Sequence, residues 1–137
     1  MRERILYHDA EKGQENKSSI LWKKYGFRGQ PPKAGSVVEK RLIDTCQEYL
    51  DAIKIRAKTG IQLDSRITGQ NINLDPMKRS DDHQRQLHNQ ISLMIIGANR
   101  SGLPPQMAEK ISDFACELIY GMKLAAYEKI LFYEQPE

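Results

Sequence analysis

A helix start signal at Ser36 constrains the fold more than any other feature of this sequence. Ser36 and Glu39 have the spacing of a capping box, in which the two side chains bond backbone N–H groups that the first helical turn leaves free. Apolar residues then follow at intervals of four, four, three and four, the spacing of one helix face. They are Val38, Leu42, Cys46, Tyr49 and Ile53. The pattern predicts a helix over residues 37–58, with Gly60 as its C-terminal cap.

A second apolar stripe predicts a second helix. It begins at Asp75-Pro76 or at Ser80, both of which suit a helix N-terminus, and ends between residues 99 and 102. Its stripe consists of Leu87, Ile91, Met94, Ile95 and Ala98. Residues 60–75 carry β-branched side chains and turn-forming residues, so a small hairpin or an ordered loop is expected between the two helices.

The third predicted helix follows Pro104-Pro105 and runs to about Glu134, with Gly121 as an internal weak position. Its core-facing stripe consists of Ile111, Phe114, Ala115, Leu118, Met122 and Ala125. At 1.5 Å per residue the helix is about 45 Å long, which exceeds the diameter of about 37 Å expected for a compact chain of this size. The helix is therefore expected to project beyond its own domain.

The projecting half of this helix carries an apolar ridge opposite the core stripe. The ridge consists of Tyr120, Leu124, Tyr127 and Leu131. An exposed ridge of this kind normally marks an interface, so we expect a homo-oligomer. The alternative is that the N-terminal segment folds back and covers the ridge with apolar side chains of its own. Those side chains are Ile5, Leu6, Ile20 and Leu21.

Residues 1–35 differ in composition from the rest of the chain. They hold eight lysines and arginines against four acids, and glycines with Pro31-Pro32 prevent a helix over residues 26–35. Two short apolar runs, at residues 4–8 and 19–22, could pair as a hairpin. With 137 residues the chain has room for one ordinary core. We expect a basic N-terminal arm or short hairpin over residues 1–35 and one helical domain over residues 36–137.

The part of the arm between residues 17 and 33 combines cations with aromatic rings. Cations suit phosphates and aromatic faces suit bases, which is the combination that binds single-stranded nucleic acid. The candidate nucleic-acid-binding residues are Lys17, Trp22, Lys23, Lys24, Tyr25, Phe27, Arg28 and Lys33. The alternative is that the three rings pack against the helix over residues 37–58 and the cations merely surround them.

Other chemistry receives little support from the sequence. His83 and His88 are five residues apart, about 140° on a helix, so they do not share a metal-binding face. The chain has no nucleophile elbow and no phosphate-binding loop. We therefore predict no catalytic residue, no metal site and no cofactor.

Carboxylates on two predicted helices are compatible with one enzymatic function. Glu48 and Asp51 form an ExxD pattern, and ExxE or ExxD motifs on facing helices can hold Mg²⁺ in helical pyrophosphohydrolases. Glu109, Asp113 and Glu117 form a carboxylate row, but such rows usually face solvent. The same row would repel phosphates, which excludes the helix-turn-helix pattern around residues 98–111 as a major-groove reader.

The sequence contains no run near the roughly 18 apolar residues that a membrane span requires. Its charged N-terminus lacks the apolar segment of a secretion signal, and Cys46 and Cys116 are too few and too far apart for a disulfide framework. A cytoplasmic location without membrane association is expected.

Taken together, these patterns predict a mainly α fold: a three-helix core, a long C-terminal helix and a small extended or β element near the N-terminus. The expected function is that of a small, non-enzymatic accessory or regulatory protein. It would bind nucleic acid through the basic aromatic arm and associate with its own copies through the C-terminal helix. The alternative is a protein-binding adaptor or inhibitor whose arm docks on an acidic partner, and an enzyme ranks third.

The capping box gives a direct test of the first helix boundary. Substituting Ser36→Ala should lower the free energy of unfolding by about 1 kcal/mol, the usual loss of an N-cap hydrogen bond. Urea denaturation followed by circular dichroism measures this change. An unchanged midpoint would mean that the helix begins elsewhere.

Overall fold

The computed structural model describes residues 16–64 and 74–134, and the regular structure in these residues is helical. The helices are α2 (Lys17–Lys24), α3 (Val37–Asp64), α4 (Asp75–Ile96), the 3-10 turn η1 (Arg100–Gly102), α5 (Pro105–Tyr120) and α6 (Leu124–Glu134). The mainly α class is confirmed. Of the two runs expected to form an N-terminal hairpin, residues 19–22 lie in α2 and residues 4–8 lie outside the described part of the chain.

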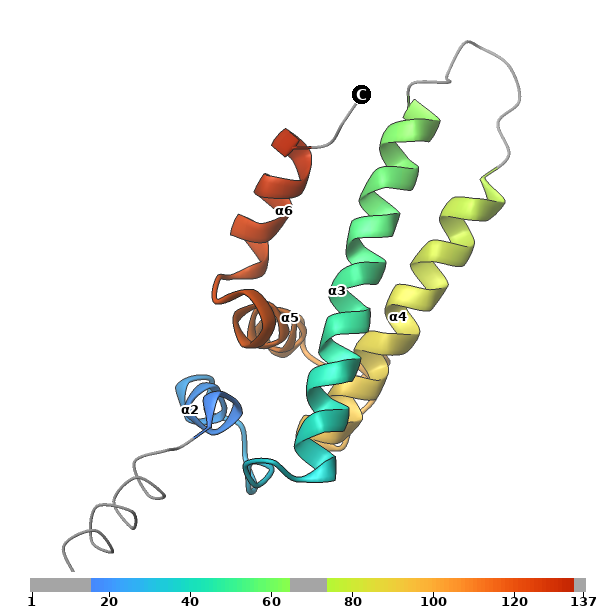
Figure 1. Cartoon of the computed structure of the whole chain (residues 1–137). Coiled ribbons are helices and arrows are strands. Elements are labelled where there is room, and N and C mark those ends of the chain that lie inside the picture. The colour runs from blue at the N-terminus through green and yellow to red at the C-terminus, as the bar shows by residue number, and fades with distance from the viewer. Residues whose placement is uncertain (1–15, 65–73, 135–137) are drawn as a thin grey trace, which may run out of the picture.

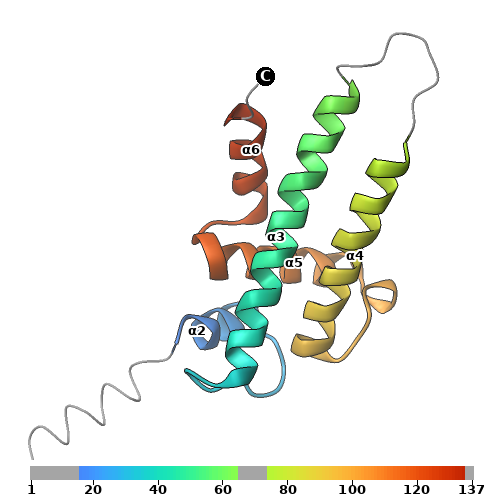
Figure 2. The same cartoon turned by 45° about the vertical axis from the view of Figure 1, so that its right-hand side comes forward.

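The longest helices, α3 and α4, lie side by side and antiparallel, and they form the frame of the molecule (Figure 1). Two contacts fix their register, one between the Tyr49 and His88 rings and one between Arg56 and Asp81. These contacts are seven residues apart on both helices, so both follow from one alignment of the pair. Helix α5 crosses α3. The chain then reverses, and α6 runs beside α3 (Figure 2).

The core forms where α3, α4 and α5 meet, and most of it follows the predicted stripes. Its central side chains are Leu42, Cys46, Tyr49, Leu50, Ile53, Leu87, Ile91, Ile95, Ile111, Phe114, Ala115 and Leu118. Val38 departs from its stripe and is exposed, because it lies in the first turn of α3, beyond the end of the register with α4. None of the described helices combines the length and apolarity needed to cross a membrane.

The first helix is longer than its pattern predicts, because α3 continues through Gly60 to Asp64. The prediction that Gly60 caps this helix is therefore wrong. A β-carbon at Gly60 would lie 2.9 Å from Nη1 of Arg56, one turn earlier, so the missing side chain makes room for the guanidinium. Residues 60–64 are thus helical, whereas the remainder of the expected hairpin or loop, residues 65–73, lies outside the described residues.

The prediction of one continuous C-terminal helix is also wrong, because the helix is interrupted at Gly121. This glycine has a φ of 75°, and its N–H bonds the carbonyl of Glu117, which ends α5 in a left-handed cap. The carboxylate of Asp113 then accepts a hydrogen bond from the backbone N–H of Leu124 at 3.1 Å, at the start of α6. The break turns α6 back along α3 instead of letting it project.

This turn removes the basis for an exposed apolar ridge. Tyr127 and Leu131 are buried within the chain at 6% and 8% exposure, and Leu124 packs partly against the core. Tyr120 stays 39% exposed, with its ring stacked on that of Tyr127 at 4.6 Å. Oligomer formation stays a prediction, but the projecting helix on which it rested is absent.

The alternative cover for the ridge receives no support from the described residues. Leu21 is buried in the core and Ile20 is exposed, while Ile5 and Leu6 lie outside the described part of the chain.

Substituting Leu131→Asp should therefore destabilise the fold of the single chain. We expect the free energy of unfolding to fall by about 3 kcal/mol or more, because the substitution removes apolar burial and places a carboxylate inside. The matched control is Ile130→Asp, at a neighbouring position that is 39% exposed, which should cost about 1 kcal/mol or less. Urea denaturation measures both. A Leu131→Asp variant that keeps wild-type stability would contradict the placement of α6.

Candidate nucleic-acid interface

The segment expected to be a basic arm begins with a short helix. Asn16 caps α2, its side-chain oxygen accepting a hydrogen bond from the backbone N–H of Ser19 at 3.1 Å. The helix has eight residues and ends at Tyr25 and Gly26. A helix of this length is not stable by itself in water, so contacts with the rest of the protein must hold it.

Aromatic packing supplies one of these contacts. Trp22 and Phe27 are only 5% and 7% exposed, and the Phe27 ring lies 5.2 Å from that of Phe114 in α5. The Tyr25 ring stacks on Phe27 at 6.0 Å, and Trp22 donates its indole N–H to the carbonyl of Arg28 at 3.4 Å. The rings thus pack mainly on α5, not on α3 as the alternative reading supposed. Covered in this way, Trp22 and Phe27 offer no face for base stacking.

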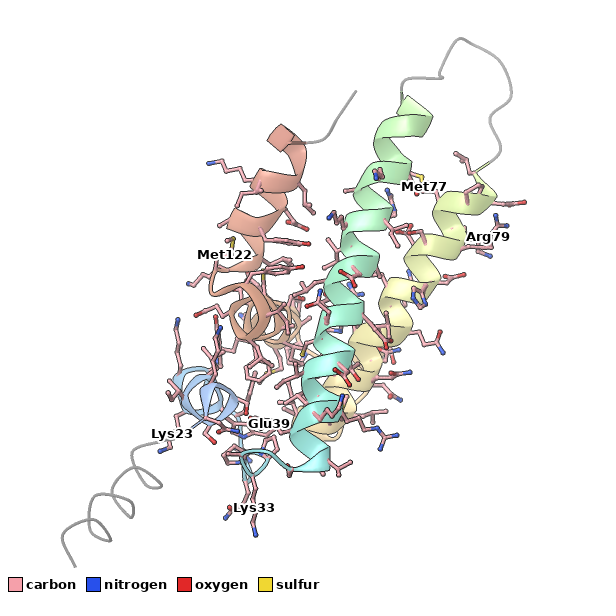
Figure 3. All side chains as sticks on the ribbon, in the orientation of Figure 1. Lys23, Lys33, Glu39, Met77, Arg79 and Met122 are labelled. Carbon is pink, nitrogen blue, oxygen red and sulfur yellow. The ribbon has the colours of Figure 1, made fainter. Side chains whose placement is uncertain are left out.

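A buried carboxylate on α3 provides the second contact. Glu39 accepts hydrogen bonds from Ser18 Oγ and from the backbone N–H of Gly35, both at 2.8 Å, and from the side-chain amide of Asn16. Burial alone would raise the pKa of Glu39, but these hydrogen bonds lower it below its ordinary value. The backbone N–H of Glu39 donates to Ser36 Oγ at 3.1 Å, as the capping box predicts. Its carboxylate bonds the N–H of Gly35 instead of that of Ser36, and its bonds to Asn16 and Ser18 anchor the start of α2 (Figure 3).

A second carboxylate, Glu117 of α5, anchors the other end of α2. It lies 2.7 Å from Nζ of Lys24 and accepts a hydrogen bond from the hydroxyl of Tyr25. Burial would raise its pKa, but the two hydrogen bonds outweigh burial and lower it. The predicted carboxylate row is therefore divided among different tasks, since Glu117 holds α2, Asp113 holds α6 and Glu109 is exposed.

The cations of residues 17–33 lie on the outside of this anchored segment. We call them the cationic surface: Lys17, Lys23, Lys24, Arg28 and Lys33. All five are exposed, and no acidic residue occurs between Lys17 and Val38. Lys23 and Lys33 extend outward from α2 and from the loop that follows it (Figure 3). The structure thus separates the eight candidates, with the cations outside and two of the three rings buried beneath them.

The described residues also locate the groups considered for other chemistry. No group of three or more His, Cys, Asp or Glu side chains among them could hold a metal ion. Glu48 and Asp51 are exposed on α3. Both cysteines are buried free thiols, and burial raises the pKa of Cys116 to about 12. Such thiols are poor nucleophiles because little thiolate forms near neutral pH.

His88, which the stripe on α4 did not include, is part of the core. It is 1% exposed, with Nε2 positioned to donate to the carbonyl of Ala108 at 3.4 Å. Burial, followed by the charge of Arg100, lowers its pKa from 6.5 to about 4, although the contact with Ala108 opposes this shift. His88 is therefore neutral at pH 7 in the folded protein.

This shift predicts a pH-dependent stability. In the unfolded chain His88 binds a proton near pH 6.5, whereas in the folded chain it does so only near pH 4. The contribution of neutral His88 to the free energy of unfolding is therefore fully present above pH 6.5 and is lost as the pH falls toward 4. At roughly 1.4 kcal/mol per pH unit, the loss has an upper limit of about 3 kcal/mol. Urea denaturation across this range should show that His88→Gln flattens the pH profile.

The exposed His83 on the same helix provides the control, and His83→Gln should keep the wild-type slope. A slope that survives in His88→Gln would contradict the assigned titration.

Comparison of the chain with protein-family models, with curated proteins and with solved structures gives no match. Its function is therefore inferred from its own residues and their geometry.

Proposed function

We propose that this protein is a small, non-enzymatic accessory protein that binds the phosphate backbone of nucleic acid through the cationic surface. The observation that carries the proposal is the arrangement of residues 17–33. Five exposed cations lie on one short helix and its following loop, with no acid in this stretch of the sequence. Lysine and arginine side chains are the groups that neutralise phosphates and release their counterions.

The anchoring of α2 supports this proposal because it fixes the positions of the cations. The bonds to Glu39 and Glu117 and the ring packing on Phe114 hold the segment at three places. A binding segment that is already ordered has less conformational entropy to lose when it binds. Lys24 also pairs with Glu117, while its side chain stays half exposed.

The burial of Trp22 and Phe27 changes the kind of binding that we expect. Without stacking on these rings, the contacts are with phosphates and carry little sequence information. Single and double strands should therefore both bind, and affinity should fall steeply with salt. If Lys17, Arg28 and Lys33 each neutralise one phosphate, the logarithm of the binding constant for duplex DNA should fall with log[salt] with a slope of about −2.7.

Self-association through the C-terminal helix is not part of this proposal, because Tyr127 and Leu131 are buried within the chain.

The test compares two triple variants of equal charge. In the first, Lys17, Arg28 and Lys33 of the cationic surface are replaced by Ala. In the second, the exposed Lys54, Lys58 and Lys78 of α3 and α4 are replaced in the same way. Affinity is measured by fluorescence anisotropy with single- and double-stranded probes at about 50 and 200 mM salt. At low salt the first variant should lose at least tenfold in affinity, and the affinity of the second should change little. Melting temperatures of both should stay near that of the wild type, since exposed cations contribute little to folding.

Equal losses of affinity in the two variants would mean that binding depends on net charge alone, which contradicts binding at the cationic surface. No binding of either probe by the wild type at low salt would overturn the proposal. Binding of poly-glutamate in the absence of nucleic-acid binding would instead favour an adaptor that docks on an acidic protein.

A further inference from the structure

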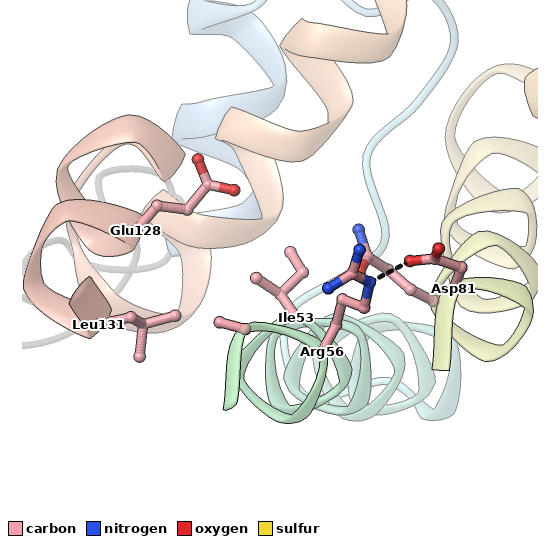
Figure 4. Close-up of a pocket in the computed structure, with 7 residues that line it drawn as sticks. Ile53, Arg56, Asp81, Glu128 and Leu131 are labelled. Atoms are coloured by element: carbon pink, nitrogen blue, oxygen red, sulfur yellow. Dashed lines mark hydrogen bonds and ion pairs between the residues drawn. The ribbon is translucent and has the colours of Figure 1, made fainter. Parts of the chain in front are cut away.

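A cavity of about 370 Å³ lies between α3, α4 and α6 (Figure 4), and no residue of the cationic surface lines it. This volume is at the lower end of the range for small-molecule sites. Ile53 and Leu131, both core residues, and Ala57 give it an apolar floor. Charged side chains line its walls, so it combines the two features that small-molecule sites need, an apolar body and a few polar groups.

One wall carries a guanidinium whose charge is already balanced. Nε of Arg56 lies 2.5 Å from a carboxylate oxygen of Asp81, joining α3 to α4. The backbone of Gly60 passes close to Nη1 of Arg56, where a β-carbon would lie 2.9 Å away. A side chain at position 60 would therefore require the end of the Arg56 side chain to shift.

Another wall carries a carboxylate whose charge is not balanced. Glu128 extends from α6, on the far side of the cavity from the Arg56–Asp81 pair (Figure 4). Among the residues that the structure describes, no cation forms an ion pair with it. Glu128 is an exposed residue, but desolvation of its carboxyl group, and then the charge of Asp113, raise its pKa above the ordinary value. These surroundings disfavour the ionised carboxylate, and a cation bound beside it would relieve that effect.

We propose that this cavity binds a small organic cation, a primary aliphatic amine, with its ammonium group at Glu128 and its alkyl chain over Ile53 and Leu131. Charge selects this class of ligand. The lining holds one cation and two carboxylates, so its formal charge is −1. An anion would find Arg56 already neutralised by Asp81 and would be repelled by Glu128. The site is separate from the cationic surface, so its test is independent of nucleic-acid binding.

The test is an NMR titration of the full chain with hexylamine, observing the methyl groups of Ile53, Ala57 and Leu131. Hexanoate and 1-hexanol serve as probes of the same chain length with a negative and no charge. We expect hexylamine to shift these methyl signals and to bind at least tenfold more tightly than hexanoate, with hexanol also weaker. Glu128→Gln should weaken hexylamine binding at least tenfold. Glu109→Gln, which removes an exposed carboxylate from α5, should leave it unchanged.

Three results would overturn the proposal. Hexanoate could bind as tightly as hexylamine, Glu128→Gln could keep wild-type binding, or hexylamine at about 10 mM could leave the three methyl groups unshifted. Melting temperatures near the wild-type value for both glutamate variants would show that lost binding reflects lost charge and not unfolding.

Discussion

The packing of aromatic rings around Phe114 is the interaction on which the functional half of the structure depends. Phe114 is fully buried in α5, and the rings of Trp22, Tyr25 and Phe27 all contact it. The eight residues of α2 are too few to form a stable helix alone, so this apolar contact keeps the helix folded and in place. The hydrogen bonds of Glu39 and Glu117 then fix its orientation. Apolar burial and charge display are thus combined in one short segment, with rings on its inner face and cations on its outer face.

Periodicity predicted the buried faces of α3, α4 and α5, but it missed α2 and did not predict where α3 and α5 end. The stripe from Leu42 to Ile53 identified the buried face of α3, because side-chain spacing on a helix is a local property. The two glycines show why the ends are harder to predict. Gly60 lies inside α3, with Nη1 of Arg56 close to where its β-carbon would be, whereas Gly121 ends α5 in a left-handed turn, after which Asp113 of α5 accepts the backbone N–H of Leu124. Apolar periodicity reports which face of a helix is buried, and it does not distinguish a glycine inside a helix from one that caps it.

The sequence predicted the exposed cations of the candidate site but not the burial of its aromatic rings. Cations with no intervening acid mark an exposed basic segment, and the structure has them exposed. The burial of Trp22 and Phe27 depends on Phe114, which is far away in the sequence, so the sequence alone allowed two interpretations. The cavity had no local signal, since Arg56, Asp81 and Glu128 come from three helices. It could be found only through the register of α3 with α4 and the reversal of the chain after α5.

The reversal at Gly121 has a consequence for how copies of this chain could combine. A residue with a β-carbon disfavours the left-handed conformation by about 1 kcal/mol or more and is better suited than glycine to a continuous helix. If residue 121 became helical, α5 and α6 would join, and Tyr127 and Leu131 would lose their place against α3 of the same chain. The equivalent place on a second copy would then be vacant as well, and each copy could lend its last helix to the other. The left-handed turn at Gly121 therefore keeps α6 packed on α3 of its own chain.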